Sequence, residues 1–317
     1  MLRNEKGDDD MSNETLEQIM NVGAAAGPFG TGDAVLEQTL RDFIQLQSNT
    51  IAIGTDLVGV RSVGWMQFKW YNGVEGTFSY PLDDNAVVDP TKVGTAAYTT
   101  TLAKGQGRCV FLDSVRLRGE SWENLDRQQL AIITARANTI DNNILSSLYG
   151  GARQTQAATS TFGSATADEE GDLLTAMDSI FANSRGITGD ESLALVLPAD
   201  KRSAMLNTQL YGNVVESLSD HLSRVASLRI YYTRDYGSGN AIDDDALLLV
   251  PGGGTAEFFQ YNGPGYQETE LTRIEGVGYS WLLTSYWGTV IHEHQDSGFT
   301  ADDGLTNRIV KITDVRA

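Results

Sequence analysis

Cysteine, histidine and lysine are all scarce in this sequence, and each shortage narrows the possible classes of protein. Cys109 is the one cysteine among 317 residues, so an internal disulfide is excluded. It stands in an apolar run before Val110 and Phe111, which is typical of a buried small hydrophobe rather than a nucleophile. No run of about 18 apolar residues occurs, and the first residues lack the apolar core of a signal peptide. These absences predict a protein made and used in a soluble compartment, with no membrane partner.

The charge balance is strongly acidic and poor in lysine. The chain contains 6 Lys and 17 Arg against 42 Asp and Glu, which gives a formal net charge of −19. Carboxylates hold water and cations well, and at molar salt a Debye length of ~3 Å quenches the self-repulsion that would otherwise swell the fold. The composition is therefore typical of a halophilic protein, with an ordinary acidic cytoplasmic protein as the alternative. It argues against nucleic-acid binding by the whole surface, although a local Arg-lined face stays open.

Common catalytic motifs are missing as well. The sequence has no Gly-x-Ser-x-Gly elbow, no Gly-x-x-x-x-Gly-Lys-Ser/Thr phosphate loop and no Gly-x-Gly-x-x-Gly fingerprint. Ser219, Asp220 and His221 are neighbours in sequence, but adjacent residues on a helix point in different directions, so they do not form a triad. We therefore predict that the chain is not an enzyme and has no catalytic residues and no cofactor.

His292 and His294 are the best candidates for a metal site. Two histidines at positions i and i+2 of a strand point to the same side and could share an ion. No third ligand is identifiable, so a structural role for both is preferred, and a halophilic metal-dependent enzyme is the less favoured alternative. The acidic run 243–245 follows Gly237-Ser238-Gly239 and is more simply a solvated turn than a cation site.

The N-terminal region is polar and then amphipathic. Residues 1–32 are rich in glycine and polar side chains, which predicts an extended arm that only a partner can order. From Asp33, a good N-cap, the residues Leu36, Leu40 and Phe43 follow helical spacing and predict a helix with one apolar face. That face requires an apolar surface on a remote part of the fold or on a neighbouring subunit.

An aromatic β-hairpin is predicted between Trp65 and Tyr80. Apolar and polar residues alternate along 65–71, and Asn72-Gly73 matches a two-residue turn before a second alternating run. A two-stranded ribbon is marginally stable by itself, and this one carries large side chains on both faces. Packing of one face on another chain and packing as an ordinary meander of the same domain are about equally compatible with the pattern.

Residues 122–149 predict one long helix. Its apolar stripe recurs at steps of three and four and comprises Leu130, Ile133, Ala137, Ile140, Ile144 and Leu148. Ser121 can cap its start, and Gly150-Gly151 can end it. An unbroken helix of this length spans ~42 Å, far more than the average helix of a globular domain.

The remainder of the chain predicts an α+β fold. Thr166 and Glu169 match a capping box for a second helix that Gly186 ends, after a polar loop over 154–167. Residues 193–197 predict a short buried strand that ends at Pro198, and a short helix follows it. Further strands are expected over 108–117, 229–233, 246–250, 255–261, 266–273, 279–294 and 307–314.

This order of elements resembles that of the major capsid proteins of tailed viruses with the Hong Kong 97-type fold, over nearly the whole chain. The segment from Ala135-Arg136-Ala137 to Gly150-Gly151 resembles the family's spine helix. Leu195-Val196-Leu197-Pro198-Ala199-Asp200 resembles its first strand of the central domain, and Ala246-Leu247-Leu248-Leu249-Val250-Pro251 with Glu257-Phe258 resembles its later strands. Each motif is degenerate, so the order carries more weight than any one of them.

The resemblance implies a division of the chain into the family's parts. These are an N-terminal arm (1–50), an extended loop or E-loop (51–94), a peripheral domain (95–186) with the spine helix 122–149, an axial domain (187–290) and return strands to the peripheral domain (291–317). The arm is too short to contain the large N-terminal scaffolding region of some relatives, so a separate scaffold or a removed pro-segment would be required.

The implied function is self-assembly into the pentamers and hexamers of an icosahedral shell around the double-stranded DNA of a tailed virus. Implied partners are other copies of the chain, DNA on the inner face, and scaffold, portal and decoration or turret proteins. The implied location is the virion, after assembly in the host cytoplasm, and the acidic composition indicates a halophilic, haloarchaeal host. An encapsulin-like nanocompartment shell of the same fold and an adhesin-like structural domain are the alternatives.

Residues expected at contacts between subunits come from the amphipathic helix and the hairpin. They are Leu36, Leu40, Phe43, Trp65, Phe68, Lys69, Trp70 and Tyr71. The aromatic members are expected to dominate, because aromatic side chains contribute most to buried contacts. Lys69 lies where some relatives form a covalent cross-link, but the sequence identifies no partner for it.

Overall fold

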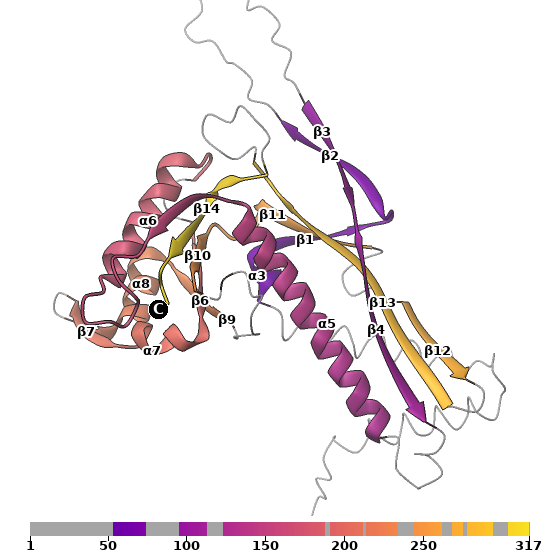
Figure 1. Cartoon of the computed structure of the whole chain (residues 1–317). Helices are drawn as coiled ribbons and strands as arrows, with labels where there is room; N and C mark the ends of the chain where they lie inside the picture. Colours follow the sequence, from indigo (N-terminus) through magenta and orange to yellow (C-terminus); the bar gives the residue numbers. More distant parts are fainter. Residues whose placement is uncertain are drawn as a thin grey trace, which may run out of the picture. The chain divides into compact units, whose positions relative to one another are not determined.

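The computed structural model describes ten ranges of the chain, drawn in colour in Figure 1. They are residues 53–73, 95–112, 123–187, 191–211, 214–233, 242, 244–261, 268–274, 278–293 and 304–316. The chain divides into two compact units. The first unit comprises residues 1–51, 104–138 and 263–286, and the second comprises 52–103, 139–262 and 287–317.

A five-stranded mixed sheet forms the centre of the second unit. Its order is β5-β14-β10-β6-β9. The strands are β5 (Ala152–Ala157), β14 (Thr306–Thr313), β10 (Ala246–Leu249), β6 (Ala194–Pro198) and β9 (Arg229–Thr233). β10 is antiparallel to both β14 and β6, whereas β5 and β9 run parallel to their neighbours at the two edges.

Both faces of this sheet are covered, because its central strands are apolar at successive positions. On β6, Leu195 and Leu197 face a core shared with α6 (Glu169–Asn183) and α8 (Leu218–Ala226). Val196 points to the opposite face, where the core includes the second half of α5. A strand buried on both sides reads as a continuous apolar run, which explains why 193–197 was recognisable from sequence.

The long helix predicted over 122–149 is α5 (Glu123–Gly150), 28 residues in length. Its apolar stripe is buried from Ile133 to Leu148, whereas Leu130 is 40% exposed. Residues up to 138 belong to the first unit and the rest to the second. No helix in the described ranges combines the length and hydrophobicity needed to cross a membrane.

The first unit contains the start of α5 and a β-ribbon. β12 (Glu268–Ile274) is antiparallel to the first part of β13 (Gly278–Ile291), and β4 (Ala103–Leu112) also pairs with β13 (Figure 1). Arg136 of α5 is buried and donates from Nε to Ser285 Oγ at 3.1 Å. Burial lowers the pKa of Arg136 to about 10, so the guanidinium stays charged at neutral pH.

In the second unit, β1 (Val58–Val63) joins β11 (Gly252–Tyr261) in parallel, and β11 is antiparallel to the end of β13. The short helix α3 (Gly54–Leu57) precedes β1. Gly54 donates its backbone N–H to Oδ1 of Asp141, a carboxyl on α5 that is 2% exposed. A Cβ at Gly54 would lie 2.9 Å from Asp141 Oδ1 and 2.9 Å from Ile144 Cβ. This close fit fixes where the chain enters β1.

Asp141 makes the stability of the protein depend on pH. Burial raises its pKa and the charge of Asp56 adds to this, while backbone hydrogen bonds from Gly54 and Ile53 act in the opposite direction. A folded pKa above the unfolded value of about 3.9 means that the stabilising contribution is full at low pH and is lost as pH rises through the folded pKa. The Asp141→Asn variant has no carboxyl at this position to titrate. The free energy of unfolding of wild type, relative to that of the variant, should therefore fall as the pH rises. Urea unfolding of both proteins from acidic to neutral pH measures this difference, and a difference that is independent of pH would contradict the prediction. Asp178→Asn, an exposed carboxyl on α6, controls for the lost charge.

The turn predicted at Asn72-Gly73 is wrong. β2 (Gln67–Gly73) continues through both residues and pairs in antiparallel register with β3 (Thr95–Thr101), with Asn72 opposite Ala96 and Gly73 opposite Thr95. The segment 74–80, expected as the returning strand, lies outside the described residues. An Asn-Gly pair favours a turn locally. Here Asn72 and Gly73 lie instead in the ladder with 95–101, where the backbone N–H and C=O groups of a strand find partners without a turn.

Helix α6 starts differently from the predicted capping box. Asp168 is its N-cap and accepts a hydrogen bond from Gly171 N at 3.1 Å. Thr166 Oγ1 instead donates to Ser160 Oγ, and Glu169 Oε1 accepts from Gly163 N. The helix ends at Asn183, before Gly186. Aspartate competes with threonine as a cap, and the sequence offers both within three positions.

Two regions differ from the expected loops and strands. The polar segment expected as a loop from 154 begins within β5, whose Gln156 donates from Nε2 to the backbone oxygen of Asp172 at 2.9 Å. The region before 229 also contains the hairpin of β7 (Thr208–Tyr211) and β8 (Val214–Ser217), followed by α8. After β6 come the 3₁₀ turn η2 (Ala199–Lys201) and α7 (Arg202–Met205), the short helix expected after Pro198.

The limits of the arm, E-loop, peripheral domain and axial domain, which the resemblance implies, remain a prediction.

Candidate assembly surface

The chain between β1 and β2 presents large apolar side chains to solvent. Trp65 is 76% exposed and Met66 is 41% exposed, at a bend that separates the two strands. The bend is attached to the residue that follows β3, because the backbone N–H of Leu102 donates to the backbone oxygen of Met66 at 2.8 Å. The side chain of Leu102 is buried. The bend therefore places an exposed tryptophan beside a backbone position that is hydrogen-bonded to Leu102.

Beside this bend, the base of the β2–β3 hairpin packs on its own unit. The ring of Phe68 lies 4.4 Å from the ring of Phe259 on β11 between centroids. Val60 on β1 is 45% exposed, and Arg61 pairs with Glu257 at 3.6 Å. The exposed residues therefore project from a base anchored by β11.

The structure locates only some of the residues expected at contacts between subunits. Trp65 and Lys69 are exposed, and Phe68 is half-buried against Phe259. Trp70 and Tyr71 lie on β2 opposite Tyr98 and Ala97, but their side chains are outside the described part. Leu36, Leu40 and Phe43 are also outside it. Their roles at an interface stay a prediction.

The histidine pair expected as a weak metal candidate is seen in part. His292 directly follows β13 and is buried, with Nε2 3.5 Å from Glu257 Oε2. His294 lies outside the described residues. Within the described ranges no cluster of three possible metal ligands occurs.

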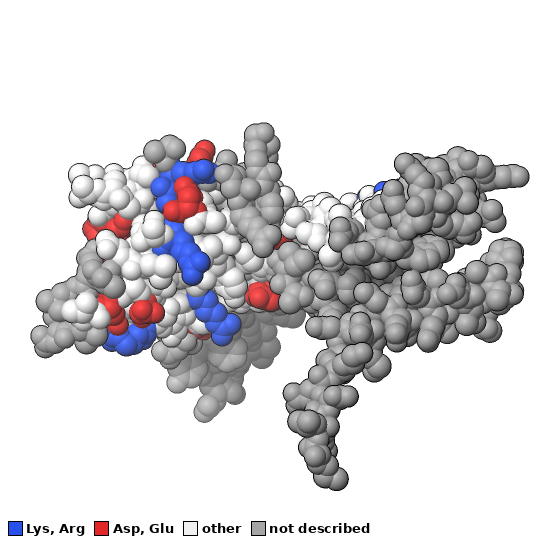
Figure 2. Space-filling model, turned by 90° about the horizontal axis from the view of Figure 1, so that it is seen from below, with Lys and Arg blue, Asp and Glu red and all other residues white. Residues whose placement is uncertain are grey.

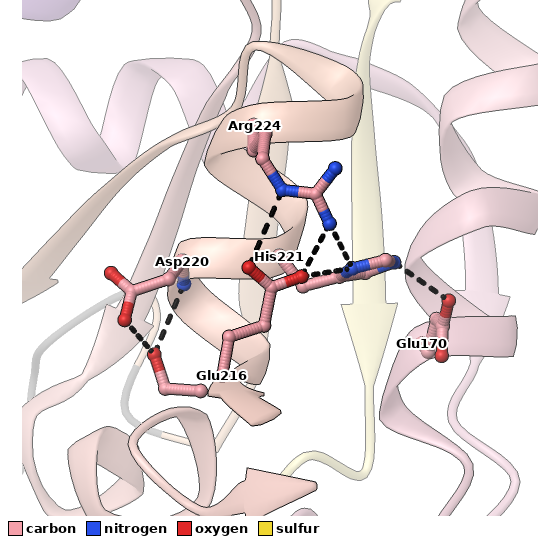
Figure 3. Close-up of polar contacts among 6 residues, drawn as sticks. Glu170, Glu216, Asp220, His221 and Arg224 are labelled. Carbon is pink, nitrogen blue, oxygen red and sulfur yellow. Dashed lines mark hydrogen bonds and ion pairs between the residues drawn. The ribbon is translucent and has the colours of Figure 1, made fainter. Parts of the chain in front are cut away.

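A polar cluster around His221 was missed by sequence reasoning. His221 of α8 lies between Glu216 of β8 and Glu170 of α6, with Arg224 beside it (Figure 3). Arg224 and His221 lower the pKa of Glu216, so this residue is an anion that accepts from both. Glu170 is 51 positions away in sequence, and no local spacing indicates that it meets His221.

Basic and acidic side chains are mixed on the surface. Figure 2 shows one face on which Lys and Arg side chains form a row, with Asp and Glu side chains next to it. Several of the described arginines are paired with acids, as in Arg224 with Glu216 and Arg316 with Asp200 at 3.2 Å. Such pairing leaves less uncompensated positive charge for a polyanion than a row of free cations would.

Solved structures of similar fold cover most of the chain. The virus-like particle from Pyrococcus furiosus has a TM-score of 0.55 at 10% identity, over 87% of this chain and 98% of that chain. The mature capsid of bacteriophage PhiM1 has a TM-score of 0.58 at 9% identity, over 83% of this chain and 86% of that one. The capsid of Myoviridae phage XM1 has a TM-score of 0.57 at 12% identity, over 83% and 91%. No protein-family model and no curated protein sequence matches the chain.

At these identities the likeness concerns the fold alone. It nevertheless extends over 86% to 98% of each of these three chains. The α+β architecture and the fold expected from the order of elements are thus both confirmed: the chain has the Hong Kong 97-type capsid fold.

Proposed function

We propose that this protein is a shell-forming subunit, the major capsid protein of a tailed virus. The observation that carries the proposal is the coverage of capsid chains: 98% of the virus-like particle chain and 91% of the phage XM1 chain are matched. A likeness limited to one domain would be compatible with many functions, whereas a whole-chain likeness to shell subunits leaves little of the chain for another role.

The proposed role is structural, and its chemistry is that of interfaces. Trp65 and Met66 offer apolar area on a bend held by the Leu102 hydrogen bond, and aromatic anchors of this kind contribute most of the free energy of association. Phe68, Lys69, Trp70 and Tyr71 on β2 are proposed to contact a neighbouring copy beside them. Leu36, Leu40 and Phe43 are proposed to contact another copy through the amphipathic helix.

Pentamers and hexamers of an icosahedral shell, filled with double-stranded DNA, are the proposed assembly. Scaffold, portal and decoration proteins are the proposed partners, and the virion is the proposed location. A shell of acidic subunits repels DNA over most of its surface, so packaging requires either local basic groups or counter-ions on the inner face. The formal charge of −19 supports a host with molar internal salt, which supplies those ions.

Electron microscopy and sedimentation of the purified chain test this function. Closed shells in molar salt that loosen in dilute buffer are expected, because salt screens the repulsion between acidic subunits. A monomer in both conditions would overturn the shell proposal. Shells of equal stability in both conditions would overturn the halophilic part alone.

The contents of shells isolated from the native source distinguish the virus from a nanocompartment. Double-stranded DNA with portal and tail proteins supports the capsid proposal. An enclosed enzyme without a genome would support the encapsulin-like alternative.

A further inference from the structure

Arg136 is a buried charge with no anion beside it in the part of the chain that the structure describes. It lies on α5 and is 8% exposed. Its hydrogen bond is donated from Nε to the neutral hydroxyl of Ser285 on β13, at 3.1 Å. Burial is what lowers its pKa, and no described carboxylate acts in the opposite direction. The positive charge is therefore enclosed without a negative partner among these residues.

Enclosing such a charge disfavours the folded subunit. With a pKa of about 10, the guanidinium of Arg136 stays protonated at neutral pH, so the charge is not removed by loss of a proton. The hydration that it loses must be replaced by an opposite charge, because a neutral hydroxyl compensates for only part of it. Buried charges in proteins are for this reason paired or bound to an ion. An anion at Arg136 would supply the missing partner.

Arg136 and Ser285 offer hydrogen-bond donors to such an anion. A guanidinium has several N–H groups in a planar fork and no acceptor, and its Nε–H is the one directed at Ser285. The oxygen of Ser285 accepts that bond, so its own O–H proton remains available as a donor. Ser285 is 3% exposed, and water therefore competes little for either group. Guanidinium and hydroxyl donors side by side in an enclosed place favour an anion over a cation.

The enclosure selects a small anion. Because Arg136 and Ser285 are both nearly covered, a carboxylate on the side chain of another protein has little access to them. A single monovalent ion requires neither a linker nor a wide opening. The acidic, lysine-poor composition supports a host with molar salt, and chloride is the small anion that accompanies the cations of such a salt.

We propose that Arg136 of α5 and Ser285 of β13 bind a chloride ion, and that this ion stabilises the folded subunit. The remaining N–H groups of the guanidinium and the Ser285 hydroxyl donate to the ion, which neutralises the enclosed charge. Both residues belong to the first unit. The unfolded chain does not bring them together, so folding and chloride binding are linked. The site belongs to the subunit and does not require that the chain forms shells.

Urea unfolding of the full-length chain at fixed sodium and varied chloride tests the site. Sodium is held at about 1 M while chloride replaces gluconate from about 0.1 to about 1 M, so that screening stays constant. Gluconate is too large for the enclosed place. The protein is kept at concentrations at which sedimentation shows it to be unassembled. For one site with a Kd of about 0.1 M or tighter, the unfolding equilibrium constant of wild type should fall about five- to tenfold over this range, relative to that of Arg136→Met.

Three variants make the test specific. Arg136→Met keeps a long side chain without the charge and should show only the general effect of the salt exchange. Ser285→Ala removes one donor and should respond to chloride less than wild type does. Arg108→Met is the matched control, because Arg108 Nε donates to Ser280 Oγ at 2.6 Å in the same way. Arg108 is exposed, so water hydrates its charge, and this variant should retain the wild-type response.

Chlorine NMR of the folded protein gives a second reading that does not depend on unfolding. Bound chloride that exchanges with the solution should broaden the line in the presence of wild type and Arg108→Met, and less so with Ser285→Ala. The site is disproved if wild type and Arg136→Met respond equally to chloride, or if Arg108→Met loses the response as fully as Arg136→Met does. An absence of broadening with wild type overturns the proposal even if Arg136→Met fails to fold.

Discussion

Replacement of Trp65 by alanine should prevent shell assembly while leaving the subunit folded. The side chain is 76% exposed in the subunit, so its removal should change the free energy of unfolding by less than about 0.5 kcal/mol. Truncation of an aromatic anchor at an interface costs about 2 kcal/mol or more per contact. Each contact would then weaken about thirtyfold, and a closed shell repeats the contact in every subunit.

Sedimentation in molar salt measures the fraction of Trp65→Ala in shells, and urea unfolding of dissociated subunits measures its stability. Leu174→Ala is the matched control. Leu174 is also a large apolar residue at the surface, 40% exposed, but it lies on α6 and not at the bend. It should assemble as wild type does. Normal assembly of Trp65→Ala, or an equal loss of stability and assembly, would show that the bend is not an anchor between subunits.

Gly59→Ala should destabilise the subunit itself, by about 1 to 3 kcal/mol. A Cβ at Gly59 would lie 2.7 Å from Gly253 Cα and 3.1 Å from Gly253 N. Both are backbone atoms of β11, the strand that pairs with β1, so no change of rotamer relieves the contact. The strands must separate or shift, at the place where their register already changes between Val58 and Gly59. Because β1 leads into the bend, assembly should fall together with stability.

Two neighbouring glycines provide controls for this prediction. A Cβ at Gly64 would meet nothing within 4 Å, so Gly64→Ala should be neutral. Gly253→Ala tests the same pair of strands from the other side, where the added Cβ would lie no closer than 3.6 Å to any other group. Urea unfolding of the three variants ranks them. Equal stability of Gly59→Ala and Gly64→Ala would contradict the close approach of β1 and β11.

The two predictions separate folding from assembly. Trp65 lies outside the packed cores and is expected to act only when a second surface covers it. Gly59 lies inside the sheet and is expected to act on the subunit, with assembly affected through the position of the bend. Loss of stability in Trp65→Ala, together with normal stability and lost assembly in Gly59→Ala, would contradict both predictions.

Periodic burial was readable from the sequence. The stripe of Ile133, Ile140, Ile144 and Leu148 predicted α5 to within one residue at each end, and the unbroken apolar run predicted β6. The strand over 229–233 was predicted with its observed limits. These patterns repeat over several turns or positions, so one misleading residue does not hide them.

Single-residue signals were less reliable than patterns. Asn72-Gly73 indicated a turn and lies within a strand, and Thr166 indicated a cap that Asp168 supplies. Polar Gln154 and Gln156 indicated a loop, although both lie on the edge strand β5, where their amides donate to Asn307 of β14 and to the backbone oxygen of Asp172 of α6. A turn or cap preference amounts to about 1 kcal/mol or less, which pairing with another segment readily exceeds.

The sequence by itself determined the mixed α+β class, the long helix, most strands, the acidic surface and the order of elements from which the capsid fold was inferred. Only the tertiary structure decided that β2 pairs with 95–101, that β1 approaches β11 at Gly59, and that Glu170 meets His221. The reason is that helix and strand periods record the burial of successive residues along one segment. The partner of a segment depends instead on which distant backbone edge or side chain the closed chain brings within hydrogen-bond distance, and no local spacing encodes that choice.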